Sequence, residues 1–384
     1  MKHLNGEKLS ALLKMRLDDN VKNARVSGAQ LIVRQNGETV AKLSAGYQNP
    51  VKSEPIRTDA IFRLASMTKP VTGVAAMVAV DMRLFNIDDL VSDYLPQFAD
   101  MYVGEIKDNT VVAGKKAETP LRIHHMMSHV SGLYPETKIG SMLNGAIPKE
   151  AYTSQKTLVD WCSSKPLAFE PESYTSYSSR AAFDTVARII EIQSGMQYKD
   201  FLKKYIFDPL GMKDTTYTPT EEQWPRFITL TDRVAGAEFA AIDLGRHVFE
   251  GLPLTYTGAG SCLASTLDDY SRFAEMLLNE GELDGVRIFS KERIKDFTLP
   301  RVPRETPGRD PVSSWGLGVR VVDKEDVLPV GSFGWSGAYG THFWVDPENK
   351  VTAVYLRNSR FYDAGGCGNI GRQFEKDVMS CFED

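Results

Sequence analysis

The chain has 384 residues, of which 42% are hydrophobic and 25% are charged, and its formal net charge is −5. This composition is typical of a globular protein with a sizeable core, built as one large domain or two closely packed ones. The basic residues are scattered along the sequence, so neither a nucleic acid nor an anionic membrane surface is expected as a partner.

The N-terminal segment predicts neither export nor membrane insertion. Leucines recur at helical spacing from Leu9 to Leu17 among charged residues, which is typical of an amphipathic helix and not of an apolar signal core. No apolar run reaches the roughly 18 residues that a transmembrane helix needs. The cysteines show no Cys-x-x-Cys spacing, which predicts reduced buried thiols in a cytoplasmic protein without a bound metal. They are Cys162, Cys262, Cys367 and Cys381.

Strand-like runs at residues 29–33 and 39–43 follow, and the Asn-Gly pair between them predicts a tight hairpin. A third apolar run, at residues 60–62, leads into Ser66 and Lys69 at the start of an apolar helix. Residues at i and i+3 share one helix face, so the Ser66 hydroxyl and the Lys69 amine can share a hydrogen bond. Burial would lower the pKa of the amine, which could then accept the proton of Ser66.

The spacing alone is weak evidence, because a Ser-x-x-Lys pattern is expected by chance about once or twice in a chain of this length. This copy is the only one in the chain, and it lies between a predicted strand and a predicted helix. That context suits a nucleophile, since the backbone N–H of Ser66 at the helix start can donate to a developing oxyanion.

Between roughly residues 85 and 245 the pattern is mainly helical. Residues 181–194 form one predicted helix with Gly195 as its C-cap, and residues 198–205 form another. Three segments rich in glycine, proline and charged residues are predicted to be surface loops. They are residues 104–118, 136–150 and 300–314.

The last part of the chain predicts a second hairpin, at residues 342–345 and 351–356, and a closing helix at residues 370–382. The predicted fold class is therefore α/β, of the α+β kind: an antiparallel sheet flanked by helices, with an inserted helical lobe. We expect residues 1–85 and 246–384 to form the sheet domain and residues 86–245 the mainly helical domain.

Five segments, taken in order with Ser66 and Lys69, resemble the serine β-lactamase and penicillin-binding-protein superfamily. The nearest branches are the class C β-lactamases and the family VIII carboxylesterases, and the resemblance runs from about residue 25 to residue 380. The segments are Leu121–Leu133, Tyr177-Ser178-Ser179, Ile206–Thr215, Gly258–Thr266 and Trp335-Ser336-Gly337-Ala338.

The resemblance implies a role for each matching position. Ser66 matches the acylated serine, Lys69 the lysine of the same motif, and Tyr177 the tyrosine that shares proton transfer with it. The backbone N–H groups of Ser66 and Ala338 match the oxyanion hole, for which a carbonyl-binding site needs two convergent donors. The positions that match substrate-binding residues are Ser179, Trp335, Ser336 and Gly337.

Two departures from the class C pattern favour an esterase. Trp335 stands where the family usually has a lysine that helps to bind the substrate carboxylate, so binding of an anionic β-lactam should be weakened. Ser179 stands where the family usually has an asparagine, so a side chain that would contact the substrate amide is missing. The absence of a predicted signal peptide also favours an intracellular esterase over a periplasmic β-lactamase.

Three other residues invite a functional reading. His125 and His129 have the i, i+4 spacing of a zinc-binding pair, but no third ligand follows, so we expect packing and hydrogen bonding instead. Glu275 lies in a Glu-x-x-Leu-Asn pattern like that of class A β-lactamases, but its amphipathic surroundings predict a solvated helix face.

The sequence thus predicts a serine hydrolase that acts on carboxylic esters through an acyl-enzyme on Ser66, without a cofactor. The substrate would be a small-molecule ester or a β-lactam-like compound, and the oligomeric state is not predicted. Three alternatives stay open: a class C-like β-lactamase or D-amino-acid peptidase, an acyltransferase that uses the same acyl-enzyme, and a non-catalytic penicillin-binding-like sensor.

Overall fold

A computed structural model describes residues 2–234, 238–360 and 366–383, without the side chains at residues 233–239 and 361–369. Its largest element is an antiparallel sheet of eight strands in the order β13-β14-β15-β16-β17-β2-β3-β4. The strands are β13 (Ser313–Trp315), β14 (Arg320–Val322), β15 (Phe333–Ser336), β16 (His342–Asp346), β17 (Val351–Arg357), β2 (Gly28–Gln35), β3 (Glu38–Asn49) and β4 (Glu54–Pro55). The predicted antiparallel sheet is confirmed.

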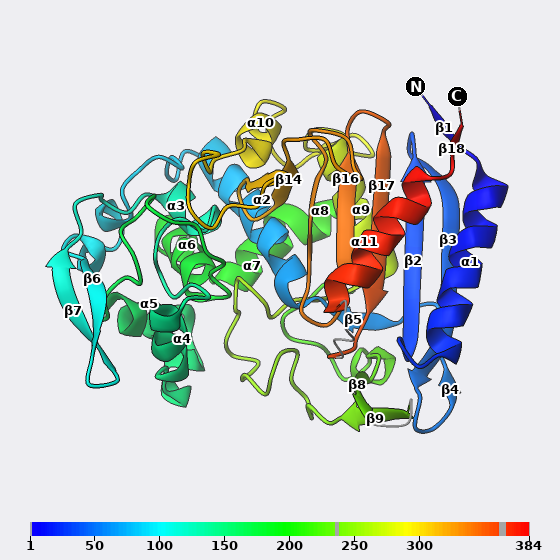
Figure 1. Cartoon of the computed structure of the whole chain (residues 1–384), viewed down its shortest axis with the longest axis horizontal. Coiled ribbons are helices and arrows are strands. Elements are labelled where there is room, and N and C mark those ends of the chain that lie inside the picture. Colours follow the sequence, from blue (N-terminus) through cyan, green and yellow to red (C-terminus); the bar gives the residue numbers. More distant parts are fainter. Residues whose placement is uncertain (1, 235–237, 361–365, 384) are drawn as a thin grey trace.

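Helices cover both faces of this sheet (Figure 1). The helices α1 (Gly6–Lys22) and α11 (Gly366–Met379) pack on one face, and α9 (Leu267–Leu278) packs on the other. The side chains of β2 alternate between two apolar clusters: Leu31 and Val33 pack with α1, whereas Ile32 belongs to the cluster that contains α9. Double coverage explains why nearly every residue of β2 is buried.

Both predicted hairpins are confirmed. The first is β2–β3, whose register pairs Gln35 with Glu38, and the second is β16–β17, whose register pairs Asp346 with Val351. The closing helix is confirmed but ends at Met379, earlier than predicted. The chain then adds strand β18 (Phe382–Glu383), which pairs with β1 (His3–Leu4) and brings the two termini side by side (Figure 1).

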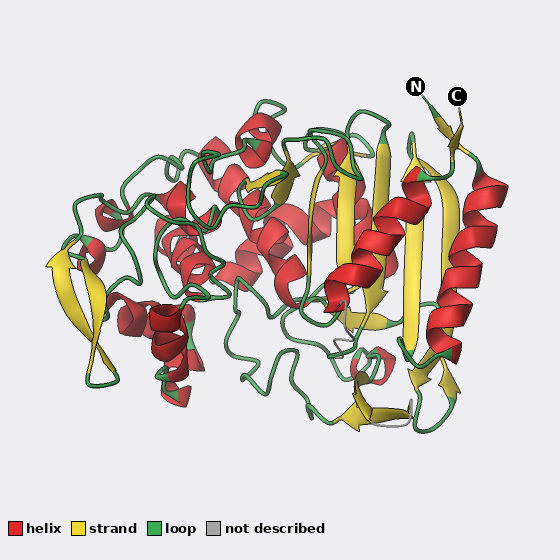
Figure 2. Cartoon of the chain, in the orientation of Figure 1, coloured by secondary structure: helices red, strands yellow, loops and turns green. Residues whose placement is uncertain are grey.

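A helical lobe lies beside the sheet (Figure 2). The predicted helix at residues 181–194 is confirmed with its left-handed C-cap, since Gly195 has φ +69°. The predicted helix at residues 198–205 is α7, which continues as a π-helical turn, Lys203–Phe207. The helices of this lobe are α3 (Ile123–Met127), α4 (Lys138–Gly145), α5 (Gln155–Ser163), α6 (Ala181–Ser194), α7 (Tyr198–Leu202) and α8 (Asp208–Leu210).

Two of the predicted loops are wrong. Residues 104–118 lie mostly in a hairpin of β6 (Tyr102–Lys107) and β7 (Thr110–Lys116), whose turn residues Asp108 and Asn109 both have positive φ. An Asp-Asn pair with positive φ at both positions closes a two-residue hairpin, a signal that the charged composition obscured. Residues 136–150 include α4, which Thr137 caps by accepting the Gly140 N–H at 3.1 Å.

A second hairpin, β8 (Leu230–Val234) with β9 (Glu238–Ile242), also lies within the stretch predicted to be mainly helical. The predicted loop at residues 300–314 contains only the start of β13. Further elements are α10 (Arg293–Thr298), the pair β11 (Glu282–Leu283) and β12 (Val286–Arg287), and the pair β5 (Ile61–Arg63) and β10 (Ala264–Thr266).

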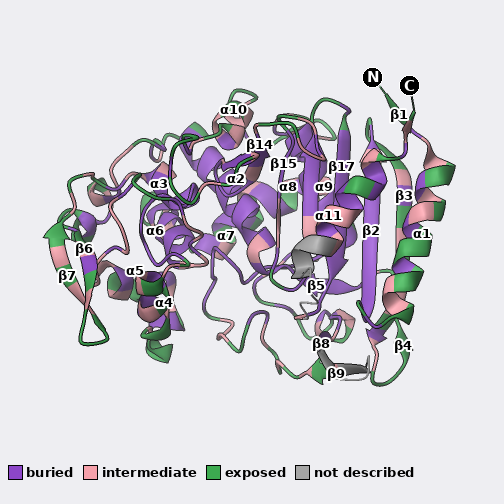
Figure 3. Ribbon diagram, viewed as in Figure 1, coloured by how far each residue is buried: buried purple, intermediate pink, exposed green. Residues whose placement is uncertain are grey.

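The helix α2 (Thr68–Asp81) runs through the centre of the molecule, and every residue from Thr68 to Val80 is buried (Figure 3). Its apolar sequence therefore predicted its environment correctly. Cys162, Cys262 and Cys381 are buried free thiols, and the side chain of Cys367 lies outside the described residues. No helix among the described residues is long and apolar enough to cross a membrane.

Candidate active site

A strained turn presents Ser66 between β5 and α2. Ala65 has φ +47°, a left-handed conformation that a non-glycine residue adopts at a cost of roughly 1–2 kcal/mol. The Thr68 hydroxyl donates to the Ala65 carbonyl at 2.7 Å and holds the turn. Because the following residues start α2, this strand–turn–helix arrangement leaves Ser66 half-buried at the N-terminal end of a helix.

Ser66 meets the two other predicted catalytic side chains. The Tyr177 hydroxyl donates to Ser66 Oγ at 2.6 Å, and Lys69 Nζ donates to the same oxygen at 3.3 Å. Tyr177 comes from the segment just before α6, 111 residues further along the chain. A serine oxygen between a phenol and an amine can lose its proton to a neutral amine, directly or through the phenol as a relay.

Lys69 is fully buried in the first turn of α2. Its Nζ donates to the backbone carbonyls of Ser179 at 2.7 Å and Gly260 at 2.9 Å. Desolvation lowers the pKa of Lys69 to about 7, although the negative charge of Asp184 opposes this effect. A substantial fraction of this amine is therefore neutral near pH 7 and able to accept a proton.

Tyr177 is held among aromatic rings. Its ring centroid lies 4.7 Å from that of His129, 5.5 Å from that of Trp335 and 6.0 Å from that of Trp315. Lys69 Nζ lies 4.6 Å from the centroid of the Tyr177 ring, within cation–π distance. Burial raises the pKa of Tyr177 above its ordinary value, so the phenol is protonated at neutral pH and poised to donate.

The two histidines pack and hydrogen-bond, as expected. His129 Nδ1 accepts the Ser178 N–H at 3.0 Å, and burial holds the pKa of His129 well below its usual range. His125 Nδ1 accepts the Arg122 N–H at 3.2 Å, and its Nε2 lies 3.2 Å from a Glu172 oxygen. The residues that the structure describes contain no group of three or more side chains suited to a metal ion.

The segment Trp335-Ser336-Gly337-Ala338 begins at the end of β15, where the Trp335 ring lies 5.5 Å from that of Tyr177. The pairing of β14 with β15 ends at Arg320 opposite Gly334, so it does not extend to Trp335 and Ser336. A Cβ on Gly337 would lie 2.1 Å from the Leu64 carbonyl oxygen, so only glycine fits there. The same Leu64 carbonyl accepts a hydrogen bond from the Thr341 hydroxyl at 2.9 Å. These contacts bring the backbone after Gly337 against the turn that carries Ser66.

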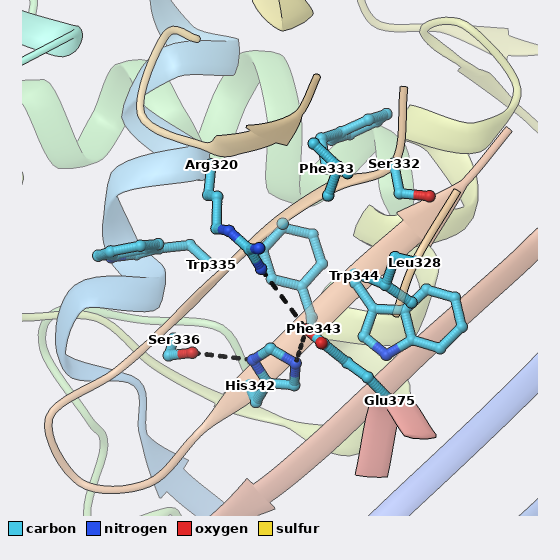
Figure 4. A pocket seen from close by; sticks show the side chains of 12 residues that line it. Arg320, Leu328, Ser332, Phe333, Trp335, Ser336, His342, Phe343, Trp344 and Glu375 are labelled. Atoms are coloured by element: carbon cyan, nitrogen blue, oxygen red, sulfur yellow. Dashed lines mark hydrogen bonds and ion pairs between the residues drawn. The ribbon is translucent and has the colours of Figure 1, made fainter. Parts of the chain in front are cut away.

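Behind Ser336, a small cavity of about 60 Å³ is lined by charged and aromatic side chains (Figure 4). Ser336 Oγ lies 2.8 Å from His342 Nδ1, and His342 Nε2 lies 3.3 Å from a Glu375 oxygen. Arg320 Nη2 bonds Asp326 at 3.0 Å, and its Nη1 lies 3.9 Å from Glu375. The guanidinium of Arg320 is thus directed toward acidic partners.

The solvated position predicted for Glu275 is wrong. Its side chain is 2% exposed and accepts a hydrogen bond from the hydroxyl of Thr352 on β17. The helix α9 packs on the sheet through a face wide enough to include Glu275, and the threonine compensates the buried carboxylate. This contact places the residue in the interface between α9 and the sheet.

The structure brings the side chains of Ser66, Lys69 and Tyr177 together, with other groups around them that no sequence motif had marked. The Gly260 carbonyl was invisible because a backbone acceptor leaves no side-chain signal, although the segment Gly258–Thr266 stood out as a motif. Trp315 lies 4.5 Å from Trp335 between ring centroids, and no local pattern marked it. Ser179 contacts Lys69 through its backbone carbonyl rather than its side chain.

Comparison with known proteins agrees with this fold and arrangement. The family model described as Beta-lactamase matches residues 13–375, so the chain belongs to the beta-lactamase family. The chain is 27% identical over 370 residues to the protein Rv1367c of Mycobacterium tuberculosis, covering 89% of this chain and 90% of that protein. It is 25% identical over 395 residues to the esterase EstB of Burkholderia gladioli, covering 94% of each.

A solved structure shares the whole fold. The structure titled "EstCE1, a hydrolase with promiscuous acyltransferase activity" matches with a TM-score of 0.78 at 19% identity, covering 98% of each chain. The predicted superfamily is therefore confirmed, and its relatives include hydrolases.

Proposed function

We propose that this chain is a serine hydrolase that cleaves carboxylic esters through an acyl-enzyme on Ser66. The observation that carries the proposal is the hydrogen bonding of Ser66 Oγ to both Tyr177 and Lys69, together with a Lys69 pKa lowered to about 7. The esterase EstB among the relatives supports the same reaction class.

In the proposed mechanism, Ser66 Oγ attacks the ester carbonyl while Lys69 accepts its proton, directly or through Tyr177. The oxyanion forms against the backbone N–H groups of Ser66 and Ala338, whose segments the contact between Gly337 and Leu64 holds together. Tyr177 then donates its proton to the leaving alcohol and takes up the proton that Lys69 had accepted. Water hydrolyses the acyl-enzyme by the same route in reverse.

The surroundings of Ser336 support a preference for neutral substrates. Glu375 is nearly fully buried; burial raises its pKa, but the His342 hydrogen bond and the nearby cations lower it further, so the carboxylate is ionised. We assign the imidazole hydrogen of His342 to Nε2, which lies 3.3 Å from a Glu375 oxygen, so that Nδ1 accepts the Ser336 hydroxyl. Ser336 then offers lone pairs to a substrate, which a substrate carboxylate cannot use, and Trp335 adds an apolar side chain beside it.

Intact-mass measurement during turnover of 4-nitrophenyl butyrate tests this proposal. We expect continuous release of nitrophenol and, after rapid quenching, a butyryl adduct of about 70 Da that peptide mapping assigns to Ser66. Release that stops near one equivalent would indicate a non-catalytic sensor. An increase in product when a second alcohol is added, with transfer to that alcohol, would identify an acyltransferase.

A further inference from the structure

Asp184 is a fully buried carboxylate that no sequence motif singled out. It lies in the first turn of α6, and both of its oxygens are occupied: one accepts the Tyr256 hydroxyl at 2.7 Å, and the other accepts the Ala259 N–H at 2.8 Å. A buried carboxylate is unfavourable unless hydrogen bonds and an opposite charge compensate it. Because the hydrogen bonds are already in place, the buried carboxylate of Asp184 still needs an opposite charge nearby.

The segment that Asp184 holds is the one that binds Lys69. Directly after Ala259, the Gly260 carbonyl accepts the hydrogen bond from Lys69 Nζ at 2.9 Å. The Ala259 carbonyl in turn accepts the hydroxyl of Thr72 at 2.7 Å, one turn along α2 from Lys69. A Cβ on Gly260 would lie 2.5 Å from the Ser179 carbonyl and 3.3 Å from Lys69 Nζ, so the backbone itself approaches the amine.

Asp184 also acts on Lys69 through its charge. Burial raises the pKa of Asp184 to about 6, so the carboxylate is still ionised above neutral pH. Among the charges that act on Lys69, Asp184 has the largest effect that favours the protonated amine. Other titratable groups face this pair: Arg180, Glu136, Cys262, His129, Tyr177, Tyr256, Cys162, Tyr152, Tyr198 and Tyr217.

We propose that Asp184 is a positioning residue for catalysis, which places Lys69 through Ala259 and Gly260 and sets the basicity of its amine. The carboxylate does not touch the substrate or Ser66 in this account. Its hydrogen bonds fix the carbonyl that aims Lys69 Nζ at Ser66, and its charge keeps the amine basic enough to accept a proton. The inference rests on the proposed function in that Lys69 is taken as the proton acceptor.

The test is the pH profile of kcat/KM for 4-nitrophenyl butyrate in wild type and Asp184→Asn. Asparagine keeps the shape and both hydrogen bonds, because its oxygen can accept the Ala259 N–H and its amide can donate to Tyr256 Oη. Loss of the charge lowers the pKa of Lys69, so the midpoint of the acid limb should move to lower pH by about half a unit or more. The activity above pH 8 should fall about threefold, because a less basic amine is a weaker general base.

The matched control is Asp269→Asn. Asp269 is also a buried carboxylate, which accepts the Asp214 N–H at 2.8 Å and the Thr215 hydroxyl at 3.0 Å, away from Lys69. Its replacement should leave the acid limb unchanged. A purely structural role of Asp184 predicts the same for Asp184→Asn, and an unshifted limb in a folded Asp184→Asn variant would overturn the proposal.

Two further measurements keep the inference testable. If Asp184→Asn does not fold, Tyr256→Phe removes one hydrogen bond to the carboxylate, favours its neutral form and should shift the limb in the same direction by a smaller amount. If wild type hydrolyses no ester, the proposed function fails, but the rate at which a fluorophosphonate labels Ser66 still depends on the same amine and can be measured against pH. An unshifted pH profile of labelling in Asp184→Asn would then overturn the inference about Asp184 by itself.

Discussion

The two sides of the candidate site differ in burial and in the number of hydrogen bonds that hold their side chains. Lys69 is fully buried in a helix whose first 13 residues are all buried, and its amine donates to two backbone carbonyls and Ser66. Trp335 and Ser336 are half-buried at a strand edge that β14 does not cover. In the proposed mechanism, the helix side has the groups that move protons, whereas the strand side has the side chains that a substrate would meet.

This difference teaches how chemistry and substrate choice can be separated in one site. A change on the helix side should reduce the rate for every substrate, because it alters groups that act in the transition state. A change on the strand side should alter the ratio between substrates and leave the common chemistry in place. The following predictions test that separation.

Ser66→Ala should have the largest effect. Removal of the nucleophile should lower the turnover of 4-nitrophenyl butyrate by about a thousandfold or more and abolish labelling by a fluorophosphonate. Ser66 is half-buried, so the thermal unfolding midpoint should stay close to that of wild type. Labelling of the folded variant at wild-type rate would place the nucleophile elsewhere.

Lys69→Ala and Tyr177→Phe should each lower kcat by roughly a hundredfold, as expected for a positioned proton-transfer group. Because both side chains bond the same Ser66 oxygen, the double variant should lose less than the product of the two single losses. The measurement is a double-mutant cycle with 4-nitrophenyl butyrate and acetate. Strictly multiplicative losses would show that the two groups act independently.

Trp335→Lys should lower the ratio of kcat/KM for 4-nitrophenyl butyrate to that for nitrocefin. A lysine at this position could form a charge-assisted hydrogen bond with a substrate carboxylate, worth about 1.5–3 kcal/mol. The KM for nitrocefin should therefore fall by roughly tenfold to more than a hundredfold. Trp335→Leu is the matched control, since it opens the same space without adding a charge. If the KM for nitrocefin fell equally in both variants, removal of the bulky indole and not the added charge would explain the change.

His342→Phe should have the smallest effect. In the proposed tautomer, loss of His342 Nδ1 removes the acceptor of the Ser336 hydroxyl, which is then free to donate to a substrate carboxylate. The kcat/KM for nitrocefin should then improve by about fivefold, the value of one ordinary hydrogen bond. Arg372 still bonds Glu375 at 2.8 Å, so that buried carboxylate keeps a cation. The gain should disappear in the double variant with Ser336→Ala, and its persistence there would exclude the serine as its source.

Much of the fold could be predicted because its signals are local. The Asn-Gly hairpin at β2–β3, the apolar helix α2 and the Gly195 cap each depend on neighbouring residues. The hairpin β6–β7 was missed because its charged composition resembles that of a loop, although the turn residues Asp108 and Asn109 carry the correct signal. Composition describes solvent exposure better than it describes strand pairing.

From the sequence, site residues could be predicted only where a side-chain motif marks them. Ser66 and Lys69 are neighbours in sequence, and the family motif supplied Tyr177. The predicted position of Glu275 was wrong, because Thr352 on strand β17 compensates the buried charge, which looks solvent-exposed from the sequence of its own helix. Asp184 was missed for a similar reason, since its partners lie more than 70 residues away.

The central claim is that the site hydrolyses neutral esters in preference to anionic β-lactams. The most direct test is the ratio of kcat/KM for 4-nitrophenyl butyrate to that for nitrocefin, measured with wild-type protein in one buffer. The proposed account predicts a ratio well above one, on the order of tenfold to a hundredfold, because Trp335 and Ser336 offer no partner for a carboxylate. A ratio at or below one would show that the carboxylate is recognised and would replace the esterase by a β-lactamase.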